Sequence, residues 1–379
     1  IGERKKVIIE DFPIREQYLP VEMLSNAFVK KLIKAKTIEN FLKTIGGEGA
    51  DRAKVVHMFV AIRIRYDFPF WAASFAKIKN KDGGDDVQFR LTRPQRKFVN
   101  VLEKHRKAKK PIRIILLKAR QWGGSTTSQL YMAWLQLVHK KGLNSLIIAH
   151  QGSGTDEIKD MFDRMVKAYP IDLLYGIGDS FNPDEPKLVG VGKSGAIYRV
   201  PQRNCTIKLG SAERPDSCRG GSYSLIHCSE VGVWKKTEGK SPQEIVQSAC
   251  SGVLYRPYTM IVFESTAKGT GNFFHTEWCA ASDPEIDSVF YPLFISWYDI
   301  DQYSLPFDSE EEEIEFAKRL YANRNNLNVN SNREESGRYL WWLWEKGATL
   351  QAIKWYIIER SGRDDHGLMA SEYPTDDIE

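Results

Sequence analysis

The sequence predicts an α/β fold with a mostly parallel central sheet flanked by helices, because a strand pattern followed by a helix pattern occurs twice in succession. Apolar runs of strand length at 113–117 and 144–150 are each followed by a helical pattern, at 128–139 and 153–169. A succession of strand, helix, strand and helix is typical of a parallel sheet whose right-handed crossovers cover both faces. Further short strands are expected at 197–200, 205–209, 223–228 and 259–264.

A glycine-rich turn joins the first of these strands to its helix and predicts a phosphate-binding loop. Glycines let several backbone N–H groups point inward, and the helix N-terminus adds partial positive charge. A hydroxyl from Ser125 or Thr126 would then reach a nucleotide-bound Mg²⁺. A plain strand-to-helix connection uses glycine in the same way, so the neighbouring motifs must decide. The residues expected to hold a nucleotide here are Lys118, Gln121, Trp122, Gly123, Gly124, Ser125 and Thr126.

The loop departs from the pattern G-x-x-x-x-G-K-[ST] at one position. Gly124 stands where that pattern has lysine. Because the phosphates still need a positive charge, it must come from another residue. Lys118, at the end of the strand, and Arg120, in the turn, are the two candidates.

The strand at 223–228 ends in a polar pair, Ser229-Glu230. Open α/β sheets keep their chemistry at the carboxyl ends of the strands. A nucleotide hydrolase needs there a group that orients the Mg²⁺ shell and a carboxylate that positions the attacking water. Glu230 fits the catalytic role. Ser229 fits the metal role less well than aspartate because it is neutral, so it would act through a metal-bound water; a Ser-Glu strand end is also common on plain surfaces.

Two further residues are candidates for supporting the reaction. Thr266 follows the strand at 259–264, where a small hydroxyl residue can sense the γ-phosphate and pass its loss to neighbouring elements. Arg219 lies beside Gly220 and Gly221, on a loop that could reach transition-state charge in a neighbouring subunit. The alternative for Thr266 is a plain glycine-rich turn. The alternatives for Arg219 are a contact with DNA phosphate and a solvated side chain.

Gln95 is the candidate for recognising a base. It lies in the first turn of a helix expected to begin near Pro94, a favourable position for proline. A glutamine amide carries both a donor and an acceptor, so it can pair with the two-sided edge of adenine. Without the phosphate loop, Gln95 would be an ordinary exposed residue of a helix.

The composition limits the class of protein. The 379 residues can bury a large core, and 54 basic against 49 acidic residues give a formal charge of +5, which permits nucleic-acid binding without requiring it. The five cysteines are scattered without a C-x-x-C pair, so neither a zinc site nor a disulfide framework is expected. No apolar run is long enough to cross a bilayer and no signal peptide is recognisable, which favours the cytosol.

Taken together and in this order, the motifs resemble the ATPase domain of the large terminase subunit, the DNA-packaging motor of tailed bacteriophages and related viruses. Gln95 falls on the family's adenine-reading glutamine and 118–127 on its phosphate loop. Some terminases carry a deviant loop with lysine at its start, as Lys118 is here. The stretch 225–230 resembles the Walker B strand in a variant with serine for aspartate, and 264–267 resembles the coupling motif. Arg219 lies where some members place a trans-acting arginine finger.

The resemblance implies a P-loop NTPase of the ASCE or RecA-like type that uses ATP and Mg²⁺. It implies three parts: a helical N-terminal lead-in at 1–65, an ATPase core at 66–298, and a lid with a linker at 299–379. Full-length terminases continue into a nuclease domain, and this sequence leaves no room for one. We therefore expect an ATPase fragment or split polypeptide without nuclease activity, in which Asp376 and Asp377 are not metal ligands.

The partners implied by the resemblance are double-stranded DNA, the portal protein and a small terminase subunit. The working form would be a homo-oligomeric ring on the procapsid portal, in the host cytoplasm and without a membrane. Two other functions remain open from the residues alone. One is a helicase-like DNA-dependent ATPase, which needs a second ATPase-like lobe. The other is a DNA-binding scaffold without nucleotide chemistry, since Gly124 and Ser229 both depart from the usual pattern.

Overall fold

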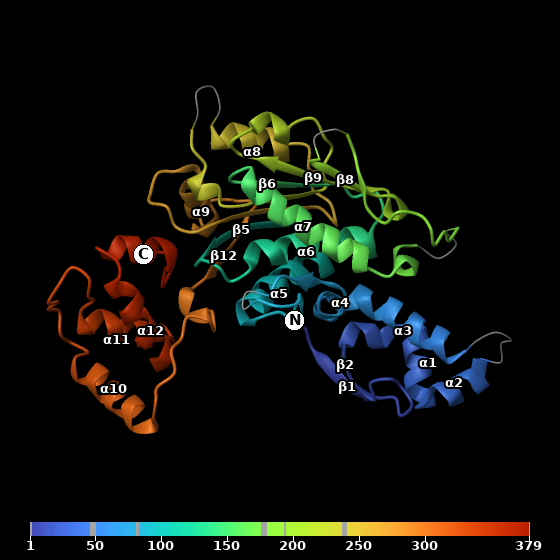
Figure 1. Ribbon diagram of the computed structural model, residues 1–379, viewed down its shortest axis with the longest axis horizontal. Coiled ribbons are helices and arrows are strands. Elements are labelled where there is room, and N and C mark those ends of the chain that lie inside the picture. The colour runs from blue at the N-terminus through green and yellow to red at the C-terminus, as the bar shows by residue number, and fades with distance from the viewer. Residues whose placement is uncertain are drawn as a thin grey trace. The chain divides into compact units, whose positions relative to one another are not determined.

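The computed structural model describes residues 2–45, 51–80, 83–175, 180–192, 195–236 and 241–378 (Figure 1). The chain forms two compact units, each assembled from separate stretches of sequence. Unit 1 comprises Ile1–Leu91, Gln129–Ser145 and Thr155–Lys208, and unit 2 comprises Thr92–Ser128, Leu146–Gly154 and Leu209–Glu379. These units do not follow chain order, unlike the predicted division into 1–65, 66–298 and 299–379.

The largest sheet has eight strands in the order β12-β5-β11-β10-β6-β9-β8-β7. The pairs β10–β11, β11–β5 and β12–β5 are parallel, whereas β7–β8 and β8–β9 are antiparallel. The predicted α/β fold with a mostly parallel sheet is therefore confirmed, and each predicted strand is present. The strands are β5 Ile112–Lys118, β6 Ser145–Ala149, β7 Val189–Gly190, β8 Ile197–Val200, β9 Cys205–Ser211, β10 Leu225–Cys228, β11 Met260–Ser265 and β12 Tyr291–Ile295.

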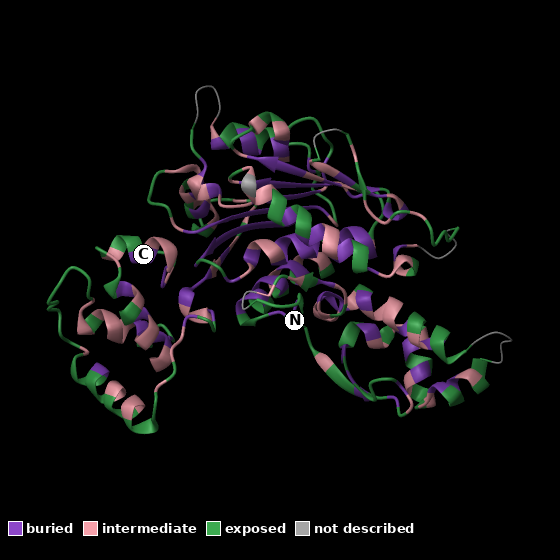
Figure 2. Cartoon of the chain, viewed as in Figure 1, coloured by how far each residue is buried: buried purple, intermediate pink, exposed green. Residues whose placement is uncertain are grey.

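The strand order places β11 between β5 and β10. Every residue of these three strands is buried. Figure 2 draws the strands of the central sheet largely in purple. Runs of apolar residues without alternation are typical of strands covered on both faces. On one face, alternate residues of the strands pack against α8 (Pro242–Cys250) and α9 (Phe273–Ser282). Because these strands pair in parallel, the carboxyl ends of β5, β11 and β10 meet at one edge of the sheet.

Helix α5 (Arg93–Lys107) begins where the sequence predicted, with Pro94 in its first turn. The N-cap residue is Thr92, whose backbone N–H donates to Oε1 of Gln95 over 2.9 Å. This bond is half of a capping box, which satisfies donors that the first helical turn leaves free. Phe98, Val99 and Leu102 on the buried side of α5 are part of the core, and the helix contacts β5.

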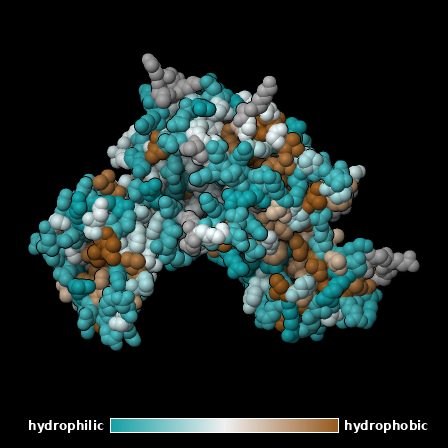
Figure 3. All heavy atoms as spheres, in the orientation of Figure 1, coloured by the Kyte–Doolittle hydropathy of each residue, from teal (hydrophilic) through white to brown (hydrophobic). Residues whose placement is uncertain are grey.

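The C-terminal part of unit 2 is helical. Ser309 caps α10, accepting from the N–H of Glu312 over 3.3 Å, with four acids in the first turn. Figure 3 shows a small group of hydrophobic side chains, in brown, on the surface of this region. The large aromatic side chains of Tyr321 and Trp344 are exposed as well. The helices are α10 Glu310–Ala322, α11 Gly337–Glu345, α12 Leu350–Ser361 and α13 His366–Glu372.

Unit 1 contains the predicted N-terminal helices, but it begins with an antiparallel hairpin that the sequence analysis missed. β1 (Arg4–Ile8) pairs with β2 (Glu16–Pro20). Both strands are short and carry charged residues, so they lack the apolar run that indicates a buried strand. Their few buried side chains join a core with those of the helices. The helices are α1 Ala27–Ala35, α2 Ile38–Ile45, α3 Arg52–Tyr66 and α4 Phe68–Phe75, followed by a second hairpin of β3 Lys77–Ile78 and β4 Val87–Gln88.

The two helices predicted after the phosphate loop are present. Helix α6 spans Gly124–Trp134 and continues as a π-helical turn at Leu135–His139, and α7 spans Ser153–Ala168. No helix in the part of the chain that the structure describes is long and apolar enough to cross a membrane.

Candidate active site

The loop between β5 and α6 has a backbone that only a few residues adopt easily. Gln121 has φ 56° and Gly123 has φ 80°, both in the left-handed region. The loop is held at its base, because the N–H of Ala119 donates to the carbonyl of Ile295 on β12 over 3.0 Å. Further along, Nε2 of Gln302 donates to the carbonyl of Gln121 over 3.3 Å. The chain thus curls directly before a helix N-terminus, as the sequence predicted.

Gly124, which replaces the usual lysine, has a structural reason to be glycine. A Cβ atom added there would lie 2.4 Å from the ring of Trp122, too close for any real contact. The Trp122 ring is buried and packs edge-to-face on Phe98, with 6.0 Å between the ring centroids. The indole therefore fills the space that a longer side chain at 124 would need.

Lys118 brings the missing positive charge into the site. It is the last residue of β5, is 5% exposed, and its Nζ lies 2.6 Å from Oε1 of Glu230. Burial by itself lowers the pKa of a lysine, but the carboxylates of Glu264 and Glu230 outweigh burial, so the pKa of Lys118 is raised. Lys118 is therefore a fixed cation at the mouth of the loop.

Glu230 lies directly beyond β10, as predicted. Its backbone is in the left-handed region with φ 54°, uncommon for a residue with a side chain, and it leads into a short helical turn at Val231–Val233. The indole Nε1 of Trp234 donates to the carbonyl of Ser229 over 3.0 Å and holds this turn. The Glu230 side chain is one-third exposed, so it faces both Lys118 and solvent.

Glu264, near the end of β11, is a site residue that the sequence analysis placed in a motif without giving it a role. Its side chain is fully buried. The hydroxyls of Ser125 and Ser229 both donate to its Oε1, the latter over 3.0 Å. Nε2 of His227 lies 3.2 Å from the same oxygen. The detectable signal is a single glutamate directly after the apolar run 260–263, since a charge buried at the end of such a strand must be compensated.

The surroundings of Glu264 keep it ionised. Burial by itself would raise the pKa of its carboxyl, but Lys118, His227 and the Ser125 hydroxyl lower that pKa to about 2. A negative charge is thus present between the phosphate loop and β10. The site combines one cation, Lys118, with two carboxylates, and two hydroxyls point at one of them.

Gln95 is buried beside the loop, and its amide is already engaged. Its Oε1 caps α5, and its Nε2 donates to the carbonyl of Trp122 over 2.9 Å. A Cβ atom on Gly123 would lie 2.6 Å from Nε2, and Gly123 has φ 80°, so a side chain at 123 would be strained and would displace the Gln95 amide. Gln95 therefore shapes the phosphate loop, a role that sequence reasoning did not foresee, and adenine recognition stays a prediction.

Two predicted arginines lie apart from this cluster. The guanidinium of Arg120 is turned to Glu372 of α13, with Nη1 to Oε1 at 2.8 Å. Arg219 is exposed on its loop and lies 3.7 Å from Asp216. Of the two candidates for the positive charge of the loop, Lys118 therefore lies in the cluster and Arg120 does not. Arg219 is at the surface, where a finger acting on another subunit would have to be.

The two predicted threonines differ in their surroundings. None of the described contacts joins Thr126 to the cluster, so Ser125 is the hydroxyl that reaches it. Thr266 is buried directly after β11. Its neighbour Ser265 accepts from the N–H of Gly232 over 3.0 Å. This bond links the segment that carries Thr266 to the turn that follows Glu230.

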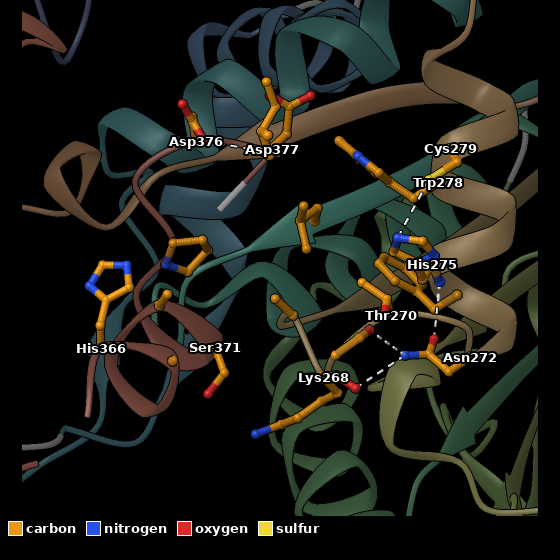
Figure 4. Close-up of a pocket in the computed structure, with 18 residues that line it drawn as sticks. Lys268, Thr270, Asn272, His275, Trp278, Cys279, His366, Ser371, Asp376 and Asp377 are labelled. Atoms are coloured by element: carbon orange, nitrogen blue, oxygen red, sulfur yellow. Dashed lines mark hydrogen bonds between the residues drawn. The ribbon is translucent and has the colours of Figure 1, made fainter. Parts of the chain in front are cut away.

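The segment after Thr266 borders a cavity of about 310 Å³, shown in Figure 4. Asn272 orders this segment: its Nδ2 donates to the carbonyls of Lys268 at 3.2 Å and Gly269 at 2.9 Å. Its Oδ1 accepts from the N–H of His275 at 3.0 Å and caps α9. Asp376 also borders the cavity, and it forms an ion pair with Lys346 at 2.9 Å.

Asn272→Ala should therefore lower the free energy of unfolding by about 1–2 kcal/mol, since it removes a helix cap and two loop hydrogen bonds. Urea denaturation measures the change. Asn272→Asp is the matched control, because it keeps the cap acceptor and loses only the donors, so its loss should be smaller. Equal losses in the two variants would show that the cap contributes nothing.

The metal ligands in this site are sparse. Among the described residues, no group of three or more histidine, cysteine, aspartate and glutamate side chains could hold a metal ion. Mg²⁺ that arrives with a nucleotide keeps several waters and uses phosphate oxygens, so it needs few protein ligands. The residues present fit such an ion: the Ser125 hydroxyl lies at the loop, and Oε2 of Glu264 is buried without a hydrogen-bond partner.

The strand order, the phosphate loop and the cation with two carboxylates define a P-loop NTPase fold of the α/β class. The chain is similar to several solved structures of the family that its motifs resemble. The ATPase domain of the large terminase of Thermus phage P74-26 is 14% identical with a TM-score of 0.42, covering 76% of this chain and 99% of that one.

Two longer proteins are similar as well. The large terminase of bacteriophage HK97 is 15% identical with a TM-score of 0.48, over 73% of this chain and 57% of that one. The large terminase of a thermophilic bacteriophage, in complex with ADP, is 16% identical with a TM-score of 0.37, over 61% and 50%. The chain thus spans about half the length of these two. No protein-family model matches the chain, and no curated protein matches it.

Proposed function

We propose that this chain is an ATPase that hydrolyses ATP with Mg²⁺. The observation that carries the proposal is the cluster at the carboxyl ends of β5, β11 and β10, where Lys118 contacts Glu230 and Ser125 contacts Glu264. Lys118 and the backbone of 121–125 bind the phosphates, Ser125 binds the metal ion, and Glu230 positions the attacking water. Mg²⁺ supplies charge stabilisation to the phosphate oxygens when it is bound.

The ion pair between Lys118 and Glu230 suggests how binding prepares the reaction. The two side chains neutralise one another at 2.6 Å. A phosphate group that takes Lys118 as its partner leaves Glu230 without that cation. The carboxylate, which is already one-third exposed, is then free to accept a hydrogen bond from water. Nucleotide binding thereby releases the residue that the chemistry needs.

Other residues take supporting roles in this proposal. Gln95 contacts adenine through the remaining donor and acceptor capacity of its amide. Thr266 couples hydrolysis to movement, through the segment that Ser265 ties to the turn after Glu230. Arg219 acts on the site of a neighbouring subunit. Arg120 supports the loop from outside, through Glu372.

We further propose that hydrolysis drives double-stranded DNA into a viral procapsid. The order of the motifs supports this, since all of them resemble those of large terminases. The partners would be duplex DNA, the portal protein and a small terminase subunit, and the working form a ring on the portal in the host cytoplasm. A helicase-like ATPase is the alternative and would need a second ATPase-like lobe; the described residues 299–378 form helices and no strand.

Nucleotide binding and Mg²⁺-dependent ATP hydrolysis by this chain test the first proposal. The measurement uses high protein concentration, with and without duplex DNA, so that a ring can form and bring in an arginine from a neighbouring subunit. Hydrolysis that requires Mg²⁺ supports the ATPase. A chain that binds no nucleotide under any of these conditions would instead be a DNA-binding scaffold, and the ATPase proposal would be wrong.

DNA binding should depend steeply on salt. Contacts to phosphates release counterions, so we expect the affinity for duplex DNA to fall at least about ten-fold between roughly 50 and 200 mM NaCl, and to vary little with DNA sequence. Fluorescence anisotropy with two duplexes of unrelated sequence measures both properties. Binding that is strong at low salt yet insensitive to added salt would contradict this proposal.

A further inference from the structure

We propose that Glu264 supplies the carboxylate that Ser229 cannot provide, so that the acidic partner of the metal ion has moved from β10 to the neighbouring strand β11. In this arrangement Ser125 and Glu264 together hold the hydrated Mg²⁺ of a bound nucleotide. The inference rests on the proposed nucleotide hydrolase function and names a residue of that site.

The strand register brings Glu264 to the required place. Cys228 of β10 pairs with Phe263 of β11, so the next residues, Ser229 and Glu264, lie level with one another. On its other side, β11 pairs with β5, with Glu264 opposite Leu116, two residues before Lys118. The Glu264 carboxylate therefore lies between the strand that leads into the phosphate loop and the strand that ends in Ser229.

The hydrogen bonds point to the same role. The hydroxyl of Ser125, the candidate metal ligand, donates to Oε1 of Glu264. The hydroxyl of Ser229 donates to that oxygen as well, at 3.0 Å. Ser229 is thus an orienting group for the glutamate. It fits beside the glutamate because it is small and neutral, whereas an aspartate at 229 would place a second negative charge there.

The second carboxylate oxygen of Glu264, Oε2, has no hydrogen-bond donor. Oε2 is buried and has no hydrogen-bond partner, although buried polar atoms are rarely left without one. Mg²⁺ bound with nucleotide keeps several waters, and each of these waters is a strong donor. A metal-bound water that donates to Oε2 would complete the bonding of Glu264 and orient the metal shell.

The test measures nucleotide binding rather than hydrolysis. The probe is the non-hydrolysable analogue AMPPNP, and the quantity is the ratio of its Kd in EDTA to its Kd in Mg²⁺. In Glu264→Gln, which keeps size and shape, we expect this ratio to fall about 10–100-fold from the wild-type value, because the metal loses its acidic partner. Glu345→Gln is the matched control, since it removes an exposed carboxylate that lies beside Arg338 on α11, outside the cluster, and should leave the ratio at the wild-type value.

A second variant keeps the test decisive even where Glu264→Gln folds poorly. In Ser229→Asp with Glu264→Gln, the carboxylate returns to β10, and we expect most of the Mg²⁺ enhancement to be recovered. The inference would be overturned if Glu264→Gln kept the wild-type ratio. It would also be overturned if the double variant showed no higher ratio than a folded Glu264→Gln single variant. Neither result would affect the ATPase proposal. Wild-type protein that binds no AMPPNP with or without Mg²⁺ would overturn the proposed function, and this inference with it.

Discussion

Glu230→Gln is expected to lower the rate of ATP hydrolysis by about 10²–10⁴-fold, the range typical for loss of a general base or a water-positioning group. Glutamine keeps the size of the side chain but accepts a proton poorly. The variant should bind ATP more tightly than the wild type. In the wild type Lys118 must give up its 2.6 Å ion pair with Glu230 to bind the phosphate, and in the variant there is no such ion pair to break. Steady-state hydrolysis and equilibrium binding of AMPPNP measure the two effects separately.

Glu345→Gln is a suitable control for this comparison. Glu345 belongs to α11, and its side chain is 45% exposed beside Arg338 at 3.3 Å, so its loss should change neither quantity. Hydrolysis at the wild-type rate in Glu230→Gln would show that another group positions the water. Weaker ATP binding in that variant would show that the ion pair does not compete with the phosphate.

Lys118→Met is expected to abolish detectable ATP binding and also to destabilise the fold. The loop has no lysine at 124 to replace the lost charge, and Arg120 is engaged with Glu372. Removing one partner of a buried ion pair typically costs about 3–5 kcal/mol, because the other charge stays buried without compensation. We expect the lower part of that range, since Glu230 is partly exposed while Glu264 is not. Urea denaturation and AMPPNP binding are the measurements.

The double variant Lys118→Met with Glu264→Gln separates the two effects. It removes the buried carboxylate together with its cation, so much of the lost stability should return. Nucleotide binding should stay absent, because the phosphate still lacks its cation. Recovery of binding in the double variant would mean that Lys118 acts only on folding. A single variant as stable as the wild type would show that Glu264 does not depend on Lys118.

Glu264 contacts or lies beside several of the residues that these variants change. It is buried beside Lys118, accepts from Ser125 and Ser229, and is followed directly by the segment that carries Thr266. Under the proposed function, a nucleotide in the phosphate loop would act on β11 through these hydrogen bonds and charges. The effect would pass along β11 to the segment before α9, which Asn272 holds in place.

The amino-acid sequence by itself determined the α/β class, six of the eight strands of the central sheet, the glycine-rich turn after β5 and the pair at 229–230. These features follow from local signals: apolar runs of strand length, glycines in a turn, and polar residues at strand ends. The helix start near Pro94 follows for the same reason, because helix starts depend on residues only a few positions apart. The hairpin of β1 and β2 was missed, since its charged strands carry no such signal.

Only the tertiary structure decided which of the candidate residues act together. The order of strands in the sheet brings 118, 230 and 264 to one edge, although they are far apart in the sequence. Packing of Trp122 explains Gly124, and the contact with Glu372 removes Arg120 from the loop. Such contacts depend on strand order and side-chain packing between distant segments, which local patterns do not encode. The role of Glu264 follows from that order, because it needs β11 to lie between β5 and β10.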